Sequence, residues 1–343
     1  MKAAVLKSWK VIDIEETDAP IPGPGEVLIK VSFTGICGSD VHIFNGTNPI
    51  ARTPVIPGHE FSGRVAALGE GVSGIEHGIR AAIQPLKFCG TCTACKRAAS
   101  HVCERLIVIG VNQDGGFAEH VVVPAECVFP IPDTLSDETA ALAEPFSIAT
   151  HSLNRGLITQ SDRVLIIGAG PIGLYCALTA HYMGARSVQI SEPNPKRRAV
   201  ADALGISAID PSQIGALDQL AKASNGEGFD LVVETSGTTG GFETATQAAS
   251  VQGRIVTLGF PSEGHSQIHI TRCIIKELSL IGSRVCTRSE FRDTLDMLTT
   301  MQERGDVDLE GLISSIRPLS ELAASIVDVE RGTETAKILI KPI

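Results

Sequence analysis

Residues 163–173 read RVLIIGAGPIG, and this stretch decides the fold. A short run that is apolar after its first residue leads into three glycines spaced GxGxxG, and an apolar helical stretch continues to Met183. Gly168 permits a tight turn, Gly170 lets the backbone approach a pyrophosphate, and Gly173 lets the helix pack closely on the strand. The pattern predicts a strand, a glycine turn and a helix whose N-terminus binds the phosphates of a dinucleotide.

A second apolar run at 187–190 ends just before Glu192, nineteen residues after Gly173. An acidic side chain at this place binds ribose hydroxyls and repels a 2′-phosphate, so NAD is favoured over NADP. The basic run at 196–198 follows closely and keeps NADP open as the alternative. The predicted cofactor residues are Gly168, Gly170, Pro171, Ile172, Gly173, Glu192 and Arg197.

Strand and helix signals continue to alternate as far as residue 281. The predicted elements are β runs at 229–233, 254–258 and 278–281, a minor strand at 208–210 and a helix at 240–250. About six parallel strands fit an α/β fold with a doubly wound sheet. Apolar residues at helical spacing over 289–303 predict an amphipathic helix whose apolar side is core.

The first part of the chain has a different pattern, with short β runs separated by Gly, Pro and Asp. These runs lie at 27–33, 61–68, 80–84, 117–123 and 128–130, and they predict an all-β, barrel-like domain. A helix is expected over 136–153, with Ser136 as its N-cap. We expect Pro145 to interrupt this helix and to present Glu144 at a bend.

Length and composition limit the class of protein. A chain of 343 residues is long for one core and favours two domains. The net charge of −10 and the scarcity of aromatic residues argue against a nucleic-acid partner and against binding to anionic membranes. No apolar run is long enough to span a bilayer, and the N-terminus lacks a signal pattern, so we expect a soluble cytoplasmic protein.

Four of the nine cysteines fall within fifteen residues, as Cys89, Cys92, Cys95 and Cys103. In a reducing compartment such a cluster favours a metal site over disulfides or free thiols. Four thiolates close a tetrahedral zinc shell and leave no open position, so the site is predicted to be structural. The lobe that holds it has little apolar content, and bound metal would supply the stability that packing does not.

A second metal site is predicted where Cys37 and His59 bracket a span that contains Ser39 and His42. Cys and His are zinc ligands, and the hydroxyl and second imidazole suit a proton path beside an open metal site. Cys37 and Ser39 follow directly after a predicted strand, where loops commonly carry chemistry.

The order of these motifs resembles the zinc-containing medium-chain dehydrogenases (alcohol, sorbitol and threonine dehydrogenases), from the N-terminal Met-Lys-Ala to residues 337–340. The resemblance implies a GroES-like β-barrel catalytic domain over residues 1–150, completed by 287–343, and a Rossmann domain over 151–286. It implies two zinc ions per chain. Such proteins are often homodimers or homotetramers.

The resemblance also implies roles for individual residues. Cys37, His59 and Glu144 correspond to ligands of the catalytic zinc, and Glu at the last position is typical of sorbitol- and threonine-type members. Glu60 lies next to the metal as a ligand or a displaceable neighbour. Ser39 corresponds to the residue that bonds the substrate oxygen and passes its proton outward, and His42 is placed to receive it.

Several alternatives remain open at this point. Glu144 could be a solvated surface residue and His42 a structural histidine, while Asp40 either supports His59 or is a turn carboxylate. The residues around 108–117 are most similar to bacterial sugar-acid members, which favours a polyol or sugar-acid substrate. Threonine, a sugar phosphate, a metal-free reductase activity and a zinc-stabilised dinucleotide sensor without turnover are the competing interpretations.

Overall fold

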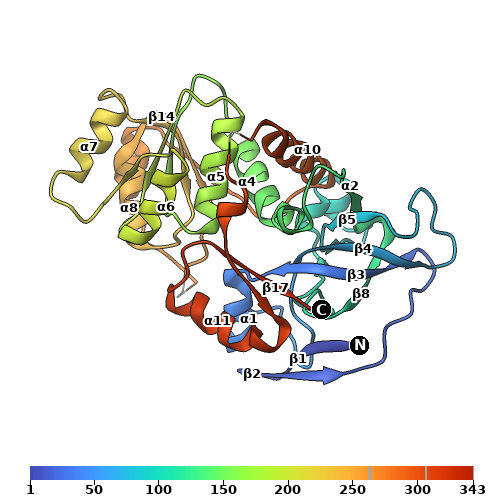
Figure 1. Cartoon of the computed structure of the whole chain (residues 1–343). Helices are drawn as coiled ribbons and strands as arrows, with labels where there is room; N and C mark the ends of the chain where they lie inside the picture. The colour runs from blue at the N-terminus through green and yellow to red at the C-terminus, as the bar shows by residue number, and fades with distance from the viewer. Residues whose placement is uncertain (262–263, 306, 343) are drawn as a thin grey trace. The chain divides into compact units, whose positions relative to one another are not determined.

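The computed structural model describes residues 1–261, 264–305 and 307–342. The chain divides into two compact units, one formed by Met1–Glu144 with Thr287–Ile343 and the other by Pro145–Cys286 (Figure 1). Each unit has its own sheet, so each is described separately.

The unit Pro145–Cys286 is built on a six-stranded sheet in which every pair of neighbouring strands is parallel. Its order is β12 (Ala208–Ile209), β11 (Ser187–Ser191), β10 (Arg163–Ile167), β13 (Phe229–Glu234), β14 (Ala249–Thr257) and β15 (Ser279–Gly282). The chain starts at the centre and winds outward in both directions, which places a topological switch point between β10 and β13. The prediction of a doubly wound parallel sheet is confirmed.

The helices that connect these strands are α5 (Pro171–Tyr182), α6 (Pro195–Ala203), α7 (Ala216–Ala223), α8 (Thr239–Ala248) and α9 (Ile270–Ile275). Helix α4 (Ala143–Arg155) precedes the first strand, β10, and starts within the last two residues of the segment Met1–Glu144. All five residues of β10 are buried, as expected for a parallel strand whose two faces are both covered. Helix α5 packs on β10 and β11, and its start at Pro171 follows the predicted glycine turn directly.

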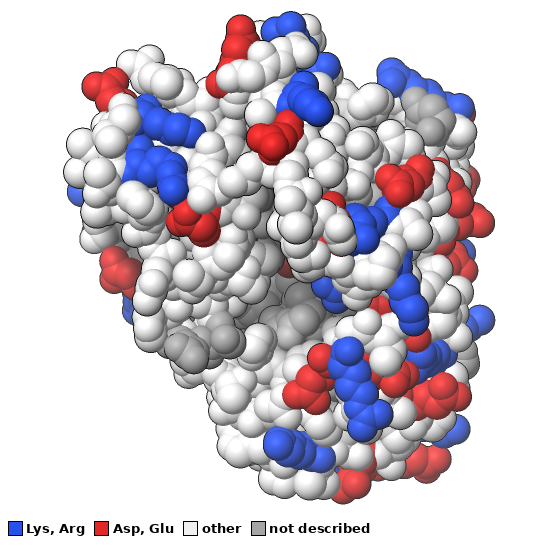
Figure 2. Space-filling model, turned by 90° about the vertical axis from the view of Figure 1, so that its left-hand side faces the viewer, with Lys and Arg blue, Asp and Glu red and all other residues white. Residues whose placement is uncertain are grey.

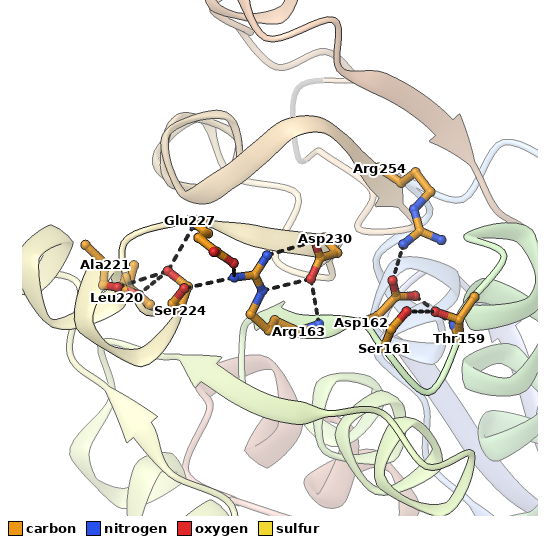
Figure 3. A network of polar contacts seen from close by, with 11 residues as sticks. Thr159, Ser161, Asp162, Arg163, Leu220, Ala221, Ser224, Glu227, Asp230 and Arg254 are labelled. Carbon is orange, nitrogen blue, oxygen red and sulfur yellow. Dashed lines mark hydrogen bonds and ion pairs between the residues drawn. The ribbon is translucent and has the colours of Figure 1, made fainter.

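Ion pairs tie together the amino ends of the central strands (Figure 3). Arg163, the first residue of β10, donates to both carboxylate oxygens of Asp230 at 2.9 and 3.0 Å and also pairs with Glu227. Arg254 of β14 pairs with Asp162 at 2.6 Å. This network lies at the end of the strands opposite to the glycine turn, so it leaves the carboxyl ends available for a ligand.

The other unit contains a seven-stranded sheet. Its order is β16 (Ile313–Pro318), β17 (Lys337–Lys341), β3 (Glu26–Gly35), β4 (Glu60–Leu68), β5 (Arg80–Ile83) and β9 (Val128–Pro130), with β8 (His120–Pro124) also paired to β3. The long strand β3 therefore contacts β4, β8 and the C-terminal β17 (Figure 1). Small pairs add β1 (Lys2–Ser8) to β2 (Val11–Glu16) and β6 (Leu86–Lys87) to β7 (Ile107–Val108).

The expectation of an all-β first domain was too narrow. The unit also contains α1 (Gly38–Asn45), α2 (Thr93–Lys96), α3 (Asp137–Ala140), α10 (Arg288–Arg304) and α11 (Leu322–Arg331). Short 3₁₀ turns complete it at Ser100–Val102, Ala125–Cys127, Glu310–Leu312 and Leu319–Glu321. The predicted amphipathic helix at 289–303 is confirmed as α10, whose apolar side is buried.

The single helix predicted over 136–153 was wrong in detail. Ser136 is an N-cap, since its hydroxyl accepts from Thr139 N, but the helix it starts ends at Ala140 and α4 begins at Ala143. Pro145 does not interrupt α4. It occupies the first turn, where a backbone N–H has no partner in the helix and proline is tolerated.

In the ranges 1–261, 264–305 and 307–342, no helix is both long and apolar enough to cross a membrane. Acidic and basic side chains are interspersed on the face of the molecule shown in Figure 2.

Candidate functional site

The predicted zinc ligand Cys37 is fixed at the start of α1. Its N–H donates to Asp40 Oδ2 at 2.8 Å, and its sulfur accepts from Ser39 N at 3.4 Å. This is a helix-capping arrangement in which a cysteine takes the position usually held by Ser or Asp. Ser39 consequently belongs to the first turn of a helix and not to a loop, so its hydroxyl has a defined direction.

His59 brings the two halves of the predicted site together. Its Nε2 lies 3.2 Å from Ser39 Oγ, and its Nδ1 lies 3.7 Å from Asp40 Oδ1. Cys37, His59 and Glu60 each offer a ligand atom, and these atoms all lie within 4.8 Å of one another. One carboxylate oxygen of Asp40 therefore caps α1, as expected of a turn carboxylate, while the other faces the imidazole of His59 at a distance longer than a hydrogen bond.

Lys337 belongs to this cluster and was missed by sequence reasoning. Its Nζ donates to Glu60 Oε1 and Oε2 at 2.9 and 2.7 Å and to the carbonyl of Ile36 at 3.1 Å. Gly35 lies between β17 and β4 in the sheet, and a Cβ there would clash with Glu60. The signal available in the sequence was a lysine directly before three apolar residues, 338–340.

Glu144 is buried in the first turn of α4 and interacts electrostatically with His59, Glu60 and Lys337. The alternative of a solvated surface Glu is therefore excluded. Among the described residues, Glu144 is not one of the three whose ligand atoms lie close together, which are Cys37, His59 and Glu60.

The buried groups of this site have shifted pKa values. Burial raises the pKa of Glu144 to about 7 and that of Asp40 to about 6. Burial disfavours the charged form of His59, but attraction to Asp40 and Cys37 outweighs it and raises the pKa of His59.

This donor set fits zinc. Sulfur, imidazole nitrogen and carboxylate oxygen are the ligands that Zn²⁺ takes in proteins. Asp40, Glu60 and Glu144 are all buried, and concentrating carboxylates in a dry site is costly unless cations compensate them. A divalent cation held by Cys37, His59 and a carboxylate would supply that compensation.

His42 lies farther out on α1. Its side chain is exposed, and its Nδ1 lies 3.0 Å from Thr47 Oγ1. A contact with Thr47 is compatible both with a structural histidine and with the outer end of a proton path.

The four-cysteine cluster has the size of a tetrahedral zinc site. Its ligand atoms lie within 4.8 Å of one another, and the closest sulfur pairs are 3.5, 3.5, 3.8 and 4.0 Å apart. Four sulfurs at the usual Zn–S distance of about 2.3 Å form a tetrahedron with edges of about 3.8 Å. The lobe, which includes α2, therefore fits a closed zinc site.

The glycine turn in the other unit is shaped for a dinucleotide. A Cβ on Gly168, which has φ +101°, would meet Thr235 Oγ1 at 2.7 Å, and one on Gly173 would clash with the carbonyl of Gly168. At Gly170 only Arg197 Nη1, at 4.0 Å, lies near the position of an added Cβ. The turn is thus tight where strand and helix pack and open where a phosphate would approach.

Glu192 follows β11 and is buried beside this turn. Its carboxylate accepts from Ala169 N at 2.7 Å and from Asn194 N at 2.8 Å. The two backbone contacts hold the acidic group in a defined position at the carboxyl end of the sheet. Arg197 Nε is buried and has no hydrogen-bond partner among the described residues.

Comparison with protein families gives two matches. Residues 23–133 match the alcohol dehydrogenase GroES-like domain, and residues 171–300 match the family described as zinc-binding dehydrogenase. Together these matches cover most of the chain and both units.

Similar proteins match along almost the full length. The chain is 32% identical over 342 residues to 2-dehydro-3-deoxy-L-galactonate 5-dehydrogenase of Pseudoalteromonas atlantica, covering 99% of this chain and 98% of the relative. It is 35% identical over 345 residues to L-threonine 3-dehydrogenase of Escherichia coli K12, covering 98% and 99%.

Among solved structures, a putative zinc-binding dehydrogenase from Sinorhizobium meliloti 1021 bound to NADP has a TM-score of 0.90 and 32% identity, covering 99% of each chain. Fold, motifs and relatives agree: the chain belongs to the zinc-containing medium-chain alcohol and polyol dehydrogenase family and is an oxidoreductase that acts on secondary alcohols.

Proposed function

We propose that the chain oxidises a secondary alcohol of a polyol or sugar acid with NAD as the hydride acceptor. The observation that carries the alcohol chemistry is the contact between Ser39 Oγ and His59 Nε2 at 3.2 Å, next to the group of ligand atoms formed by Cys37, His59 and Glu60. It places a hydroxyl that can accept and donate a proton beside a set of zinc ligands.

The catalytic site would hold zinc through Cys37, His59 and Glu144, with Glu60 as a neighbour or exchanging ligand. Bound zinc would supply Lewis acidity toward the substrate hydroxyl, and bound nicotinamide would supply the hydride acceptor. The four-cysteine lobe would hold a second, structural zinc.

The residues of the chain then have separate tasks. Ser39 hydrogen-bonds the substrate oxygen and accepts its proton, and the exposed His42 delivers that proton to water. Asp40 orients His59 by facing Nδ1 while it caps α1. Lys337 neutralises Glu60, so the site does not accumulate a further uncompensated negative charge.

In the unit Pro145–Cys286, which we propose as the dinucleotide-binding domain, Gly170 gives a phosphate access to the N-terminus of α5 and Glu192 binds ribose hydroxyls. The preference for NAD rests on Glu192, whose carboxylate is held by two backbone N–H groups. The NADP-bound relative from S. meliloti makes a parallel measurement with NADP necessary.

The sugar-acid preference is supported by the P. atlantica relative, whose name gives 2-dehydro-3-deoxy-L-galactonate as its substrate. L-Threonine is the second candidate, because the E. coli threonine dehydrogenase is also similar along its full length. Rates of NAD and NADP reduction across polyols, hexonates, sugar phosphates, threonine and simple alcohols decide between them. Turnover of threonine alone would overturn the sugar-acid proposal.

Cys37→Ser tests the catalytic-zinc assignment. The variant should lose turnover and one zinc per chain but retain NAD binding, which is measured by fluorescence titration. Full activity in the variant would contradict the assignment. NAD binding with no turnover of any substrate by the wild-type protein would favour a dinucleotide sensor.

We also propose a homo-oligomer, either a dimer or a tetramer. Edge strand β15 exposes Leu280, and α9 exposes Ile270, Ile274 and Ile275. Apolar side chains at a free sheet edge favour pairing with another chain. Light scattering of the wild type and of Leu280→Lys tests this, with a smaller mass expected for the variant.

A further inference from the structure

The four-cysteine lobe has polar contacts beyond its ligands. Cys103 Sγ accepts from the backbone N–H groups of Cys89 at 3.4 Å and Arg105 at 3.3 Å. Cys89 Sγ accepts from Cys92 N at 3.4 Å and from the Thr91 hydroxyl at 3.7 Å. The guanidinium of Arg105 donates to Thr91 Oγ1 at 2.6 Å.

Arg105 therefore reaches both ends of the lobe. Its backbone N–H contacts the last cysteine of the cluster, while its side chain reaches the first one through Thr91. The two sulfurs belong to residues fourteen positions apart, and the segment between them contains only short helical turns. A contact that joins the two ends limits the opening by which metal would leave.

Charge supports the same role. Four thiolates around one divalent ion carry a net charge of about −2, which hydrogen-bond donors and nearby cations stabilise. A hydroxyl that accepts a hydrogen bond from a guanidinium is a stronger donor toward sulfur. Arg105 thus acts on Cys89 both as a cation and through Thr91.

We propose that Thr91 and Arg105 form a clamp that retains the metal of the four-cysteine lobe. Arg105 is a positioning residue, since it acts through the predicted metal ligands Cys89 and Cys103. The proposal rests on the proposed function in one respect, namely that the lobe binds zinc.

Lys96 provides a matched control. It lies in the same lobe, carries the same charge and is exposed, and its side chain makes no hydrogen bond or ion pair with any described residue. Lys96→Ala removes one positive charge without removing the clamp, whereas Arg105→Ala removes both. Thr91→Val removes the hydroxyl and leaves the charge.

The experiment measures zinc retention. Zinc-loaded full-length protein is titrated with a chromophoric chelator, and the zinc of the lobe is identified as the zinc that remains in Cys37→Ser. Arg105→Ala should lower its affinity for zinc by about 10-fold or more, the usual effect of losing a group that supports a ligand. Thr91→Val should act in the same direction and Arg105→Lys should recover part of the loss, while Lys96→Ala should equal the wild type.

Equal zinc affinity in Arg105→Ala and the wild type would overturn the clamp, and so would equal losses in Arg105→Ala and Lys96→Ala, which would indicate a general charge effect. If wild-type protein holds no zinc that is lost on Cys89→Ser, the two-zinc assignment fails and the clamp fails with it. If that zinc is present but insensitive to Arg105, only the clamp is wrong. Circular dichroism before chelation shows that each variant is folded.

Discussion

Lys337 Nζ lies 2.7 Å from Glu60 Oε2, although the two residues are 277 positions apart in the chain. Both side chains are buried, with 3% and 0% exposed. The pair joins the C-terminal strand β17 to the start of β4, directly beside His59. The C-terminal segment thus contributes a charge to the candidate active site.

Lys337→Met should destabilise the protein strongly. It leaves Glu60 buried without its cation, and breaking one side of a buried pair costs roughly 3–5 kcal/mol. Denaturant unfolding of the zinc-free protein measures this free energy. The double variant Glu60→Gln with Lys337→Met should recover most of the loss, because no isolated charge remains. Equal stabilities of the single and double variants would show that the pair itself is not the cause.

The Arg163–Asp230 pair should make stability depend on acid. Hydrogen bonds from Arg163 lower the pKa of Asp230 below its ordinary value of 3.8 in the folded state. The pair therefore stabilises the protein fully above about pH 3.8 and loses this contribution as the pH falls through the lowered folded pKa. The free-energy difference between wild type and Arg163→Met should be about 2 kcal/mol near neutral pH, the size expected for charge-assisted hydrogen bonds to a partly exposed carboxylate, and should shrink in acid.

Arg186→Met is the control for that experiment. Arg186 is exposed in the same unit and makes no hydrogen bond or ion pair with a described residue. Its replacement should change stability by less than about 0.5 kcal/mol at any pH. If the difference in unfolding free energy between wild type and Arg163→Met stays constant as the pH falls, the ion pair with Asp230 is not the cause of the acid dependence.

Arg197 and Arg198 should differ in their effect on cofactor binding. Arg197 lies near Gly170, and its Nε has no hydrogen-bond partner among the described residues. Arg198, in contrast, forms an ion pair with Asp210 at 3.1 Å. We expect Arg197→Ala to raise KM about 10-fold for NADP, since a hydrogen bond to a charged group contributes about 1.5–3 kcal/mol, and to raise it less for NAD. Steady-state kinetics with both cofactors check this. Arg198→Ala should leave both KM values nearly unchanged, and a larger effect there would reverse the assignment.

Asp114 should support His59 through the backbone. Its Oδ1 accepts from Ile56 N at 3.0 Å, and the carbonyls of residues 56–58 accept from the N–H groups of residues 115–117. Asp114→Ala should therefore reduce kcat severalfold and change the metal geometry at the catalytic site, which the d–d absorption spectrum of the cobalt-substituted protein reports. Asp114→Asn keeps an acceptor and should stay close to wild type.

Asn112 is the matched control within the same loop, because its Oδ1 accepts from Val108 N and from no residue near His59 among those described. Asn112→Ala should leave the cobalt spectrum unchanged. Identical losses in Asp114→Ala and Asn112→Ala would point to general loosening of the loop.

The dinucleotide motif and the four-cysteine cluster could be predicted from sequence because both depend on residues close together in the chain. Residues 163–173 contain the strand, the turn and the helix start, and the tight approach of Gly173 to Gly168 follows from their spacing. The cysteine ligands likewise fall within one short lobe. Local errors arose where neighbouring signals competed, as at Pro145, which lies in the first turn of α4 and does not break the helix.

The catalytic cluster itself was decided by tertiary structure. Cys37 and His59 were recognisable as ligands, yet the contact of His59 with Ser39 and Asp40 depends on how α1 follows β3 beside β4. Lys337 reaches Glu60 only because β17 pairs with β3, whose Gly35 leaves room between them. Strand pairing between distant segments leaves no periodic mark in the sequence, so these partners became visible only when the sheet brought them together.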